Sequence, residues 1–379
     1  MKRRLSLGQP APWFHAAALA GNPRYAFDTA AGRWVVMLFM GSGAHEASQA
    51  AIRLVDENRA LFDDTRACFF GVTIDPGDAA KGRIAQHLPG IRWFLDFDRA
   101  ISTAYGAMEA DSDATVGQAT AYAPHWLLLD PMLCVRARAP LNKGPEILAQ
   151  LRQSLAQPAD PIPAPVLIVP NVLPRELCRR LVDIYETDGG APSGFMREEN
   201  GITVTKVDPN HKRRSDCTIT DEALVATLKG RMAEVLKPMI KRAFQFDVTR
   251  IERWIVACYD AQEQGHFRAH RDNTTKGTAH RSFACTINLN AEDYEGGDLC
   301  FPEFGPQTYR APTGGAVIFS CSLLHEARPV TRGRRYAFLP FLYDDAGARL
   351  REQNLAFVSP ELQGYRSGLP HADEAAGAA

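Results

Sequence analysis

The sequence lacks three features that would narrow its class at once: paired cysteines, a long apolar run and a dominant charge. None of the eight cysteines among the 379 residues forms a C-x-x-C pair, which argues against a zinc ribbon or a dithiol motif. We expect free thiols, as in a reducing compartment. Lysine and arginine together number 43 against 44 acidic residues, so the formal net charge is -1. Such a balance provides no field for attracting nucleic acid.

Signals for membranes and secretion are also missing. No stretch approaches the roughly 18 consecutive apolar residues of a membrane-spanning helix. The opening "MKRRL" is followed by "SLGQPAPWFHAA", in which two prolines interrupt the apolar run that a secretion signal requires. We therefore expect a cytoplasmic protein that binds neither a membrane nor a nucleic acid.

A proline-rich stretch divides the chain. A length of 379 residues exceeds one ordinary hydrophobic core, so two domains are expected. The segment "AQPADPIPAPV" (156–166) holds four prolines and cannot sustain a helix or a central strand. We expect domains at 1–156 and 165–350, a linker at 157–164 and a partly disordered tail at 351–379.

The two sides of this linker follow different patterns. Before it, continuous apolar strands such as 33–40 and 67–74 alternate with helical segments such as 45–62, which predicts an α/β sheet covered on both faces. After it, helical patterns at 175–190 and 221–244 precede many short strands with glycine and proline turns. That second pattern indicates a sandwich or barrel.

The stretch "QGHFRAHRDN" (264–273) carries the first chemical signal. In a strand, His270 and Asp272 project to the same face. One imidazole and one carboxylate are two ligands of the 2-His-1-carboxylate site that holds non-haem Fe(II). His325, at the end of the apolar strand in "GGAVIFSCSLLHEARPV", supplies a second histidine. A hydrogen-bonded surface pair is the alternative for His270 and Asp272, and His266 is not expected to be a ligand.

An arginine follows ten residues after His325. In "RRYAFLPFLYD", Arg335 shares a strand face with Ala337, whereas Arg334 points to the opposite face. A buried guanidinium without a partner is costly. A bidentate carboxylate from a ligand would satisfy Arg335, and an internal aspartate or glutamate is the alternative partner.

Residues from about 165 to 350 resemble the prolyl-hydroxylase-like branch of the Fe(II)/2-oxoglutarate-dependent dioxygenases. The resemblance is carried by "LPRELCRRLV", "VACYDAQEQGHFRAHRDN", "TINLNAEDYEGGDLCFPE" and "YRAPTGGAVIFSCSLLHEARPVTRGRRYAF", in this order. It implies a double-stranded β-helix, a jelly-roll variant with flanking helices. It also implies the site residues: iron bound by His270, Asp272 and His325, the distal carboxylate of 2-oxoglutarate on Arg335, and cosubstrate contacts from Tyr259 and Asn288. A core aromatic is the alternative role for Tyr259.

The resemblance further implies an activity. The expected enzyme uses Fe(II), 2-oxoglutarate and O2, with ascorbate as a further candidate, and releases succinate and CO2. It hydroxylates a C–H bond of a peptidyl, protein or amino-acid substrate, with proline foremost. The alternative is a non-catalytic scaffold or binding protein whose oxygenase domain is vestigial.

Four further polar residues have other interpretations. Residues 193–216 correspond to a lid in the family, where Arg213 and Arg214 contact substrate or belong to a solvated loop, and we favour the solvated loop. His211 and His280 are expected in loops.

The first 150 residues resemble peroxiredoxins and their thioredoxin-fold relatives, through "LSLGQPAPWF", "GRWVVMLFMGSG", "GVTIDPGDAAKG", "FLDFDRAISTAYGA" and "HWLLLDPMLCV". A peroxidatic cysteine belongs shortly after the strand at 33–40, where a helix N-terminus lowers its pKa. The sequence there is "GSGAHEAS", without cysteine, and Cys68 on the next strand is expected to be an inert core thiol. We expect a degenerate redoxin fold used for docking, homodimerisation or substrate presentation, with an anion site in the "GSGAH" loop as a further candidate.

Overall fold

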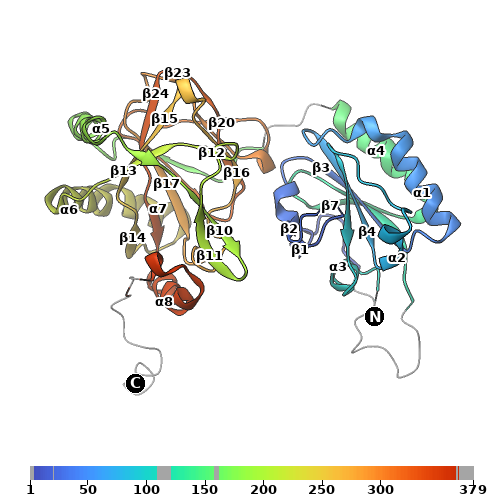
Figure 1. The fold of residues 1–379 in the computed structure, drawn as a ribbon. Coiled ribbons are helices and arrows are strands. Elements are labelled where there is room, and N and C mark those ends of the chain that lie inside the picture. The colour runs from blue at the N-terminus through green and yellow to red at the C-terminus, as the bar shows by residue number, and fades with distance from the viewer. Residues whose placement is uncertain (1–3, 20, 109–120, 158–161, 364–365, 367–379) are drawn as a thin grey trace. The chain divides into compact units, whose positions relative to one another are not determined.

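A computed structural model describes residues 4–19, 21–108, 121–157, 162–363 and 366. Contacts within the chain define two compact units, residues 1–162 with 302–305, and residues 163–301 with 306–379 (Figure 1). Most of the expected linker, at 158–161, and the end of the expected tail, at 367–379, lie outside the described residues.

Unit 1 is built on a five-stranded sheet with the order β5-β4-β3-β6-β7. Strands β3, β4 and β5 are parallel, whereas β6 and β7 are antiparallel to their neighbours. The helices α1 and α4 pack against one face of this sheet (Figure 1). These elements are β3 (Trp34–Gly41), β4 (Ala67–Thr73), β5 (Ile91–Leu95), β6 (His125–Leu129), β7 (Val135–Pro140), α1 (Glu46–Glu57) and α4 (Gly144–Ala156).

Aromatic rings cover the opposite face of the sheet in unit 1. Phe27 stacks on Phe14, with ring centres 4.7 Å apart, and Phe70 stacks on Phe94 at 4.9 Å. Strands β1 (His15–Ala16) and β2 (Tyr25–Ala26) form a small hairpin, and Phe14 and Phe27 flank it in the sequence. Two further helices of unit 1 are short: α2 spans Pro76–Ala80 and α3 spans Ala100–Ala104. Gly82, with a φ of +61°, follows α2, a backbone conformation that ends a helix.

The loop after β3 is bonded to the protein's own carboxylates. The backbone N–H of Gly43 donates to Asp78 Oδ2 at 2.8 Å, and Ser42 Oγ donates to Asp75 Oδ2 at 2.6 Å. Arg83 pairs with both carboxylates, at 2.9 Å from Asp75 and 2.7 Å from Asp78. An external anion would meet these two negative charges, so the structure gives no support to the expected anion site in this loop.

Cys68 lies in β4 and is buried. Burial raises the pKa of its thiol to about 12, and a thiol that stays protonated is a poor nucleophile. None of the eight cysteines, all among the described residues, forms a disulfide bond, and seven of them are buried. The thiol chemistry of a peroxiredoxin therefore has no support in unit 1.

Unit 2 combines helices with two main antiparallel sheets and two small two-stranded sheets, β10-β11 and β18-β23. The larger sheet has the order β14-β25-β17-β24-β15-β13-β9, with β21 and β8 joined through β17, and the smaller has the order β12-β16-β22-β19-β20. A large hydrophobic core joins the helices to the larger sheet. The two-sheet arrangement agrees with the expected jelly-roll variant. The helices are α5 (Arg175–Asp188), α6 (Glu222–Arg231) and α7 (Lys237–Phe244), and a π-helical segment (Met232–Leu236) makes the last two continuous.

The strands of unit 2 are short, as the turn-rich sequence predicted. They are β8 (Leu167–Val169), β9 (Ala191–Pro192), β10 (Phe195–Glu199), β11 (Ile202–Lys206), β12 (Lys212–Arg213), β13 (Ser215–Thr218), β14 (Arg250–Glu252), β15 (Ile255–Asp260), β16 (His266–His270), β17 (Phe283–Asn288), β18 (Glu295–Gly296), β19 (Leu299–Cys300), β20 (Thr308–Tyr309), β21 (Ala316–Ser320), β22 (His325–Ala327), β23 (Val330–Arg332), β24 (Arg334–Phe338) and β25 (Phe341–Tyr343).

The predicted end of the second domain, residue 350, falls within α8 (Asp345–Gln353). Ordered turns continue to Leu362. Val358 is buried and bridges to Thr203 of β11. Packing of this apolar side chain keeps the segment after α8 on unit 2.

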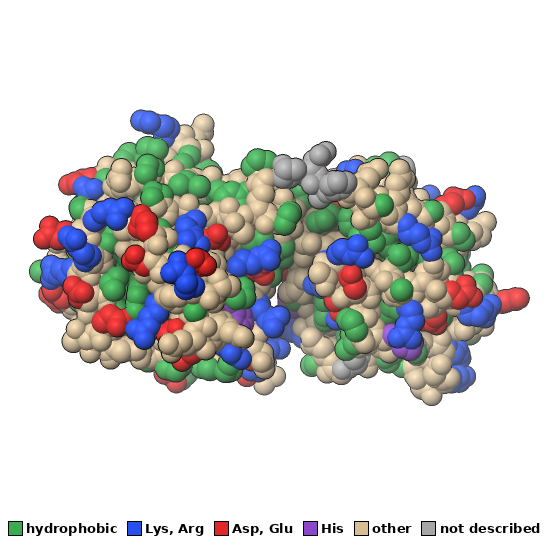
Figure 2. All heavy atoms as spheres, turned by 90° about the horizontal axis from the view of Figure 1, so that it is seen from above, with side chains coloured by type: hydrophobic (Ala, Val, Ile, Leu, Met, Phe, Trp, Pro, Cys, Tyr) green, Lys and Arg blue, Asp and Glu red, His purple; other side chains and the backbone are tan. Residues whose placement is uncertain are grey.

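The surface carries no dominant charge. Figure 2 shows basic and acidic side chains interspersed on the displayed face of each unit, in line with the net charge of -1. Among the described residues, none of the helices has the length and apolar character needed to cross a membrane.

His280 lies in a turn between strands, as the sequence predicted, but it is buried there and belongs to an ionic network. Its Nε2 is 2.5 Å from Glu252 Oε2, and the same carboxylate accepts from Arg281 and pairs with Arg351 at 3.1 Å. Burial alone would raise the pKa of Glu252, but the charge of Arg281 and the hydrogen bond from His280 outweigh it and lower this pKa well below its usual value near 4.5.

Replacing the central carboxylate tests this network. We expect Glu252→Gln to lower the free energy of unfolding of unit 2 at pH 7 by about 3 kcal/mol, because buried cations lose their partner. Because the folded pKa of Glu252 is lowered, its contribution is complete above the unfolded value and is lost as pH falls below about 4.5. Denaturant unfolding of both proteins between pH 7 and pH 3 measures this. A difference that does not narrow at low pH would contradict the assignment.

Candidate metal centre

Two neighbouring strands of the smaller sheet present the histidines to each other. Strands β16 and β22 are antiparallel, and His270 lies directly opposite His325. Asp272 follows two residues after the end of β16, where its backbone N–H donates to Cys321 O at 2.9 Å. This bond anchors the carboxylate segment beside the strand that leads to His325.

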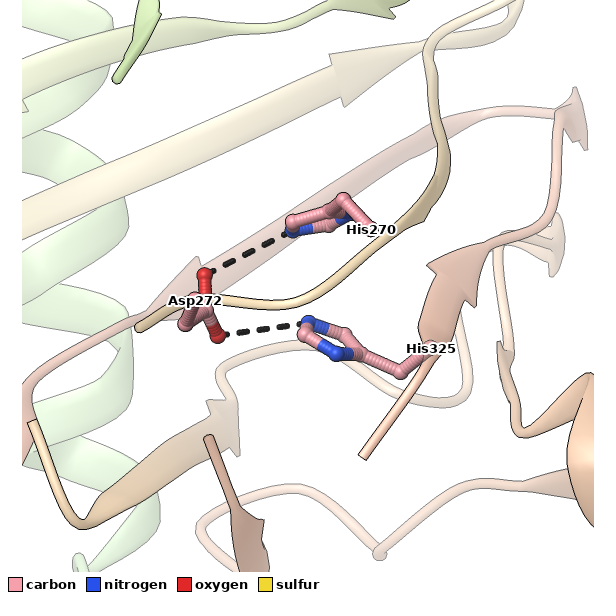
Figure 3. Close-up of side chains that lie close together, drawn as sticks. All are labelled: His270, Asp272 and His325. Atoms are coloured by element: carbon pink, nitrogen blue, oxygen red, sulfur yellow. Dashed lines mark ion pairs between the residues drawn. The ribbon is translucent and has the colours of Figure 1, made fainter. Parts of the chain in front are cut away.

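The three side chains converge on one point (Figure 3). His270 Nε2 lies 3.5 Å from Asp272 Oδ1, and His325 Nε2 lies 3.3 Å from Asp272 Oδ2. One ligand atom from each residue falls within 4.8 Å of the others. The side chains are only 15%, 12% and 6% exposed for His270, Asp272 and His325. Such spacing leaves room for one ion among two nitrogens and an oxygen.

Hydrogen bonds set the orientation of both rings. His270 Nδ1 lies 2.8 Å from Arg268 O, and His325 Nδ1 lies 3.0 Å from Leu323 O. Because a carbonyl can only accept, each Nδ1 carries the hydrogen and each Nε2 keeps its lone pair toward the centre. The backbone thereby prepares both imidazoles as ligands.

Ionisation favours the same ligand set. Burial, followed by the neighbouring charge of His270, lowers the pKa of His325 to about 4, so this ring is neutral near pH 7. Burial would raise the pKa of Asp272, but His325 and His270 outweigh it and hold this pKa well below its usual range. Two imidazoles and a carboxylate form the facial triad of non-haem Fe(II) sites.

A pocket opens beside the triad, and Arg335 forms part of its wall. Arg335 is 2% exposed, and its Nε and Nη1 are buried with no hydrogen-bond partner among the described residues. It lies opposite Tyr259 on the neighbouring strand, with its guanidinium carbon 5.0 Å from the centre of that ring. The adjacent Arg334 points away and pairs with Asp260 at 2.9 Å. Arg335 is therefore prepared for an anion that enters the pocket.

Of the other residues considered from the sequence, some line the pocket and others do not. Tyr259 lines the pocket, and its hydroxyl accepts from Arg214 Nη1 at 3.4 Å. Asn288 is buried and donates through Nδ2 to Ala311 O at 2.7 Å, and it is not among the residues that line the pocket. His266 Nδ1 lies 2.8 Å from Gln264 O, outside the three-residue cluster.

Two arginines of the pocket wall, Arg214 and Arg253, were not predicted there. We favoured a solvated loop for Arg214, but it is buried and pairs with Asp216 at 2.7 Å. Arg213, in contrast, is half-buried and donates to backbone carbonyls. Arg253 could have been found from the sequence, because alternate residues counted back from Tyr259 share its strand face.

Comparison with known proteins agrees with this geometry. Residues 254–343 match the family model of the 2OG-Fe(II) oxygenase superfamily. A PKHD-type hydroxylase of Verminephrobacter eiseniae is 37% identical over 119 residues, covering 29% of this chain and 52% of that protein. The chain spans about half the length of the first curated relatives it matches.

Solved structures resemble each part of the chain. A prolyl hydroxylase from Trichoplax adhaerens, in complex with a peptide of hypoxia inducible factor, is 18% identical with a TM-score of 0.38, over 49% of this chain and 86% of that one. The bacterioferritin comigratory protein of Xanthomonas campestris, with alkyl peroxide reduction activity, is 20% identical with a TM-score of 0.32, over 40% of this chain and 97% of that one.

The C-terminal part of the chain therefore carries a 2OG-Fe(II) oxygenase domain, as the sequence motifs predicted. The cofactors that this family implies are Fe(II), 2-oxoglutarate and O2. The site fits them: the triad offers the ligand types that Fe(II) prefers, and the unpaired nitrogens of Arg335 suit a carboxylate.

Removal of a ligand should abolish iron binding. We expect Asp272→Ala and His325→Ala to weaken Fe(II) binding at least about 100-fold, because two remaining ligands do not hold the ion. The matched control is His266→Ala, which removes a histidine of the same strand outside the cluster. Anaerobic Fe(II) titration measures all of these proteins. Equal iron affinity in Asp272→Ala and His266→Ala would rule out the centre.

Proposed function

We propose that this chain is an Fe(II)- and 2-oxoglutarate-dependent oxygenase that hydroxylates a C–H bond. The substrate is a peptidyl, protein or amino-acid side chain, with proline as the leading residue, and succinate and CO2 are the coproducts. The observation that carries the proposal is that the triad of His270, Asp272 and His325 shares one pocket with the unpaired guanidinium of Arg335.

The residues of the chain would divide the work as follows. The triad holds the metal from one side and leaves its remaining positions open. Arg335 binds the distal carboxylate of 2-oxoglutarate and thereby orients it. When bound, Fe(II) and 2-oxoglutarate supply the activation of O2, coupled to oxidative decarboxylation. Phe267 and Phe319 are apolar parts of the pocket wall and limit the entry of water.

Residues 193–216, the segment expected to form a lid, lie where we expect the substrate to enter this pocket. Strands β10 and β11 form a hairpin, and β12 pairs with β16, the strand that carries His270. Phe195 of β10 packs near Phe267 of the pocket wall, with ring centres 6.4 Å apart. We assign this hairpin to the substrate side of the site.

Two considerations favour catalysis over a vestigial domain. A binding module has no need of three metal ligands with both rings oriented by backbone carbonyls. The relative from Verminephrobacter eiseniae is named a hydroxylase of the PKHD type, which favours hydroxylation and, by the family resemblance, proline. Unit 1 lacks a cysteine in the loop after β3, and we assign it a role in docking, homodimerisation or substrate presentation.

The direct test is the release of succinate from 2-oxoglutarate, together with a mass gain of one oxygen atom in a peptide library. We expect both to require Fe(II) and to be absent from Asp272→Ala. Iron-loaded wild-type protein that releases no succinate with any member of the library would favour the binding-protein alternative.

The role of Arg335 has a separate test. We expect Arg335→Gln to weaken 2-oxoglutarate binding about 100-fold, equal to roughly 3 kcal/mol for a buried charged pair, while Fe(II) binding is unchanged. The matched control is Arg334→Gln, because that neighbouring guanidinium faces away from the pocket and pairs with Asp260. Anaerobic calorimetry of the iron-loaded proteins gives the affinities. The role would be refuted by equal affinities in the two variants.

A further inference from the structure

A second guanidinium of the pocket wall has no partner. Arg253 lines the same pocket as the triad, and it makes no hydrogen bond or ion pair in the part of the chain that the structure describes. Its Nε is fully buried. Arg214 also lines the pocket but already pairs with Asp216. The proposed cosubstrate accounts for Arg335 and leaves Arg253 unexplained.

Arg253 and Arg335 line the pocket from different positions along two paired segments of the chain. Tyr259 is directly opposite Arg335, and Arg253 precedes Tyr259 by six residues on the same chain segment. On the neighbouring segment, Arg253 stacks on Phe341, six residues after Arg335, with 4.6 Å between guanidinium carbon and ring centre. The two guanidiniums therefore face different rings, Phe341 and Tyr259. A cosubstrate anchored on Arg335 and the metal therefore leaves Arg253 unused.

The charged side chains around the pocket have a net charge of one positive, which a further anion would balance. Its three guanidiniums face two carboxylates, Asp272 and the partner of Arg214, Asp216. Fe(II) and the 2-oxoglutarate dianion carry equal and opposite charges, so their binding leaves this excess of one positive charge unchanged. Lys212 adds none at neutral pH, because burial, followed by the charge of Arg214, lowers its pKa to about 5.

The carboxylates that attract Arg253 are Asp216 and Asp272, but Asp216 is already paired with Arg214 and Asp272 belongs to the metal triad. Glu252, the residue before Arg253, is already paired with His280, Arg281 and Arg351. Arg281 also stacks on Phe341, 4.0 Å from the ring centre, so two cations share one aromatic ring. Arg253 has a φ of +71°, a conformation that costs free energy for a residue with a side chain and is found at ligand sites. A structural role alone would not explain a second cation at this ring.

We propose that Arg253 binds a carboxylate of the substrate while the metal centre holds the C–H bond to be hydroxylated. This assignment rests on the proposed function. The carboxylate has two sources: the α-carboxylate of an amino acid or of a C-terminal residue, or the side chain of an aspartate or glutamate next to the reacting residue. Either source gives the guanidinium a bidentate partner.

Matched pairs of probes separate a carboxylate from its neutral amide. N-acetyl-L-proline is compared with N-acetyl-L-prolinamide for the α-carboxylate. The blocked dipeptide N-acetyl-prolyl-glutamate amide is compared with its glutamine analogue for the side chain. Binding to full-length protein loaded with Fe(II) and 2-oxoglutarate is measured by anaerobic calorimetry, so that no turnover is required. The variants are Arg253→Gln, Arg253→Lys and, as a surface control, Arg332→Gln, whose pair with Glu295 is exposed.

We expect wild-type protein to bind at least one carboxylate probe about 10-fold or more tightly than its amide. Arg253→Gln should remove this preference, Arg253→Lys should keep part of it, and Arg332→Gln should keep all of it. The pair that shows the preference identifies the source. The assignment is overturned if neither carboxylate is preferred over its amide, if none binds, or if the preference survives in Arg253→Gln.

The same samples distinguish this inference from the proposed function. Fe(II) and 2-oxoglutarate binding are measured first in each protein. Failure to load the wild-type protein contradicts the proposed oxygenase. Normal loading without a preference for carboxylates contradicts only the role of Arg253.

Discussion

The antiparallel pairing of β16 with β22 is the constraint on which the site depends. Its register places His270 opposite His325, and the bond from the Asp272 backbone to Cys321 holds the carboxylate between the two rings. A slip of one residue would turn a ligand to the other face of the sheet. The metal centre is therefore a property of strand register as well as of residue type, and the buried core behind the larger sheet maintains the framework that fixes it.

The pocket combines this centre with two arginines of its wall, Arg335 and Arg253. Arg335 lies beside Tyr259 and Arg253 beside Phe341, and each has buried nitrogen without a partner in the described part of the chain. A buried unpaired charge costs free energy, so these arginines are best explained by ligands that bring carboxylates. In unit 1, by contrast, the loop after β3 already donates hydrogen bonds to the protein's own carboxylates, Asp75 and Asp78. The chemistry that the structure supports thus resides in unit 2.

The sequence alone was sufficient to predict the features that depend on residues close together along the chain. The alternation of a strand was enough to place His270 with Asp272, and Arg335 away from Arg334. The partnership with His325, more than fifty residues onward, needed the family resemblance, because period-two logic does not reveal which strands pair. The burial of His280 was missed for the same reason, because its partner Glu252 is remote in sequence. The inward position of Arg214 was missed although its ion-pair partner Asp216 is only two residues away, because its contact with Tyr259 is long-range.

A crystal structure of the Fe(II)-loaded protein with a 2-oxoglutarate mimic, grown without oxygen, tests the central claim most directly. The account predicts one iron bonded to Nε2 of His270, Nε2 of His325 and a carboxylate oxygen of Asp272, with the distal carboxylate of the mimic on Arg335. An iron bound elsewhere, or a mimic that leaves Arg335 without a partner, would contradict it.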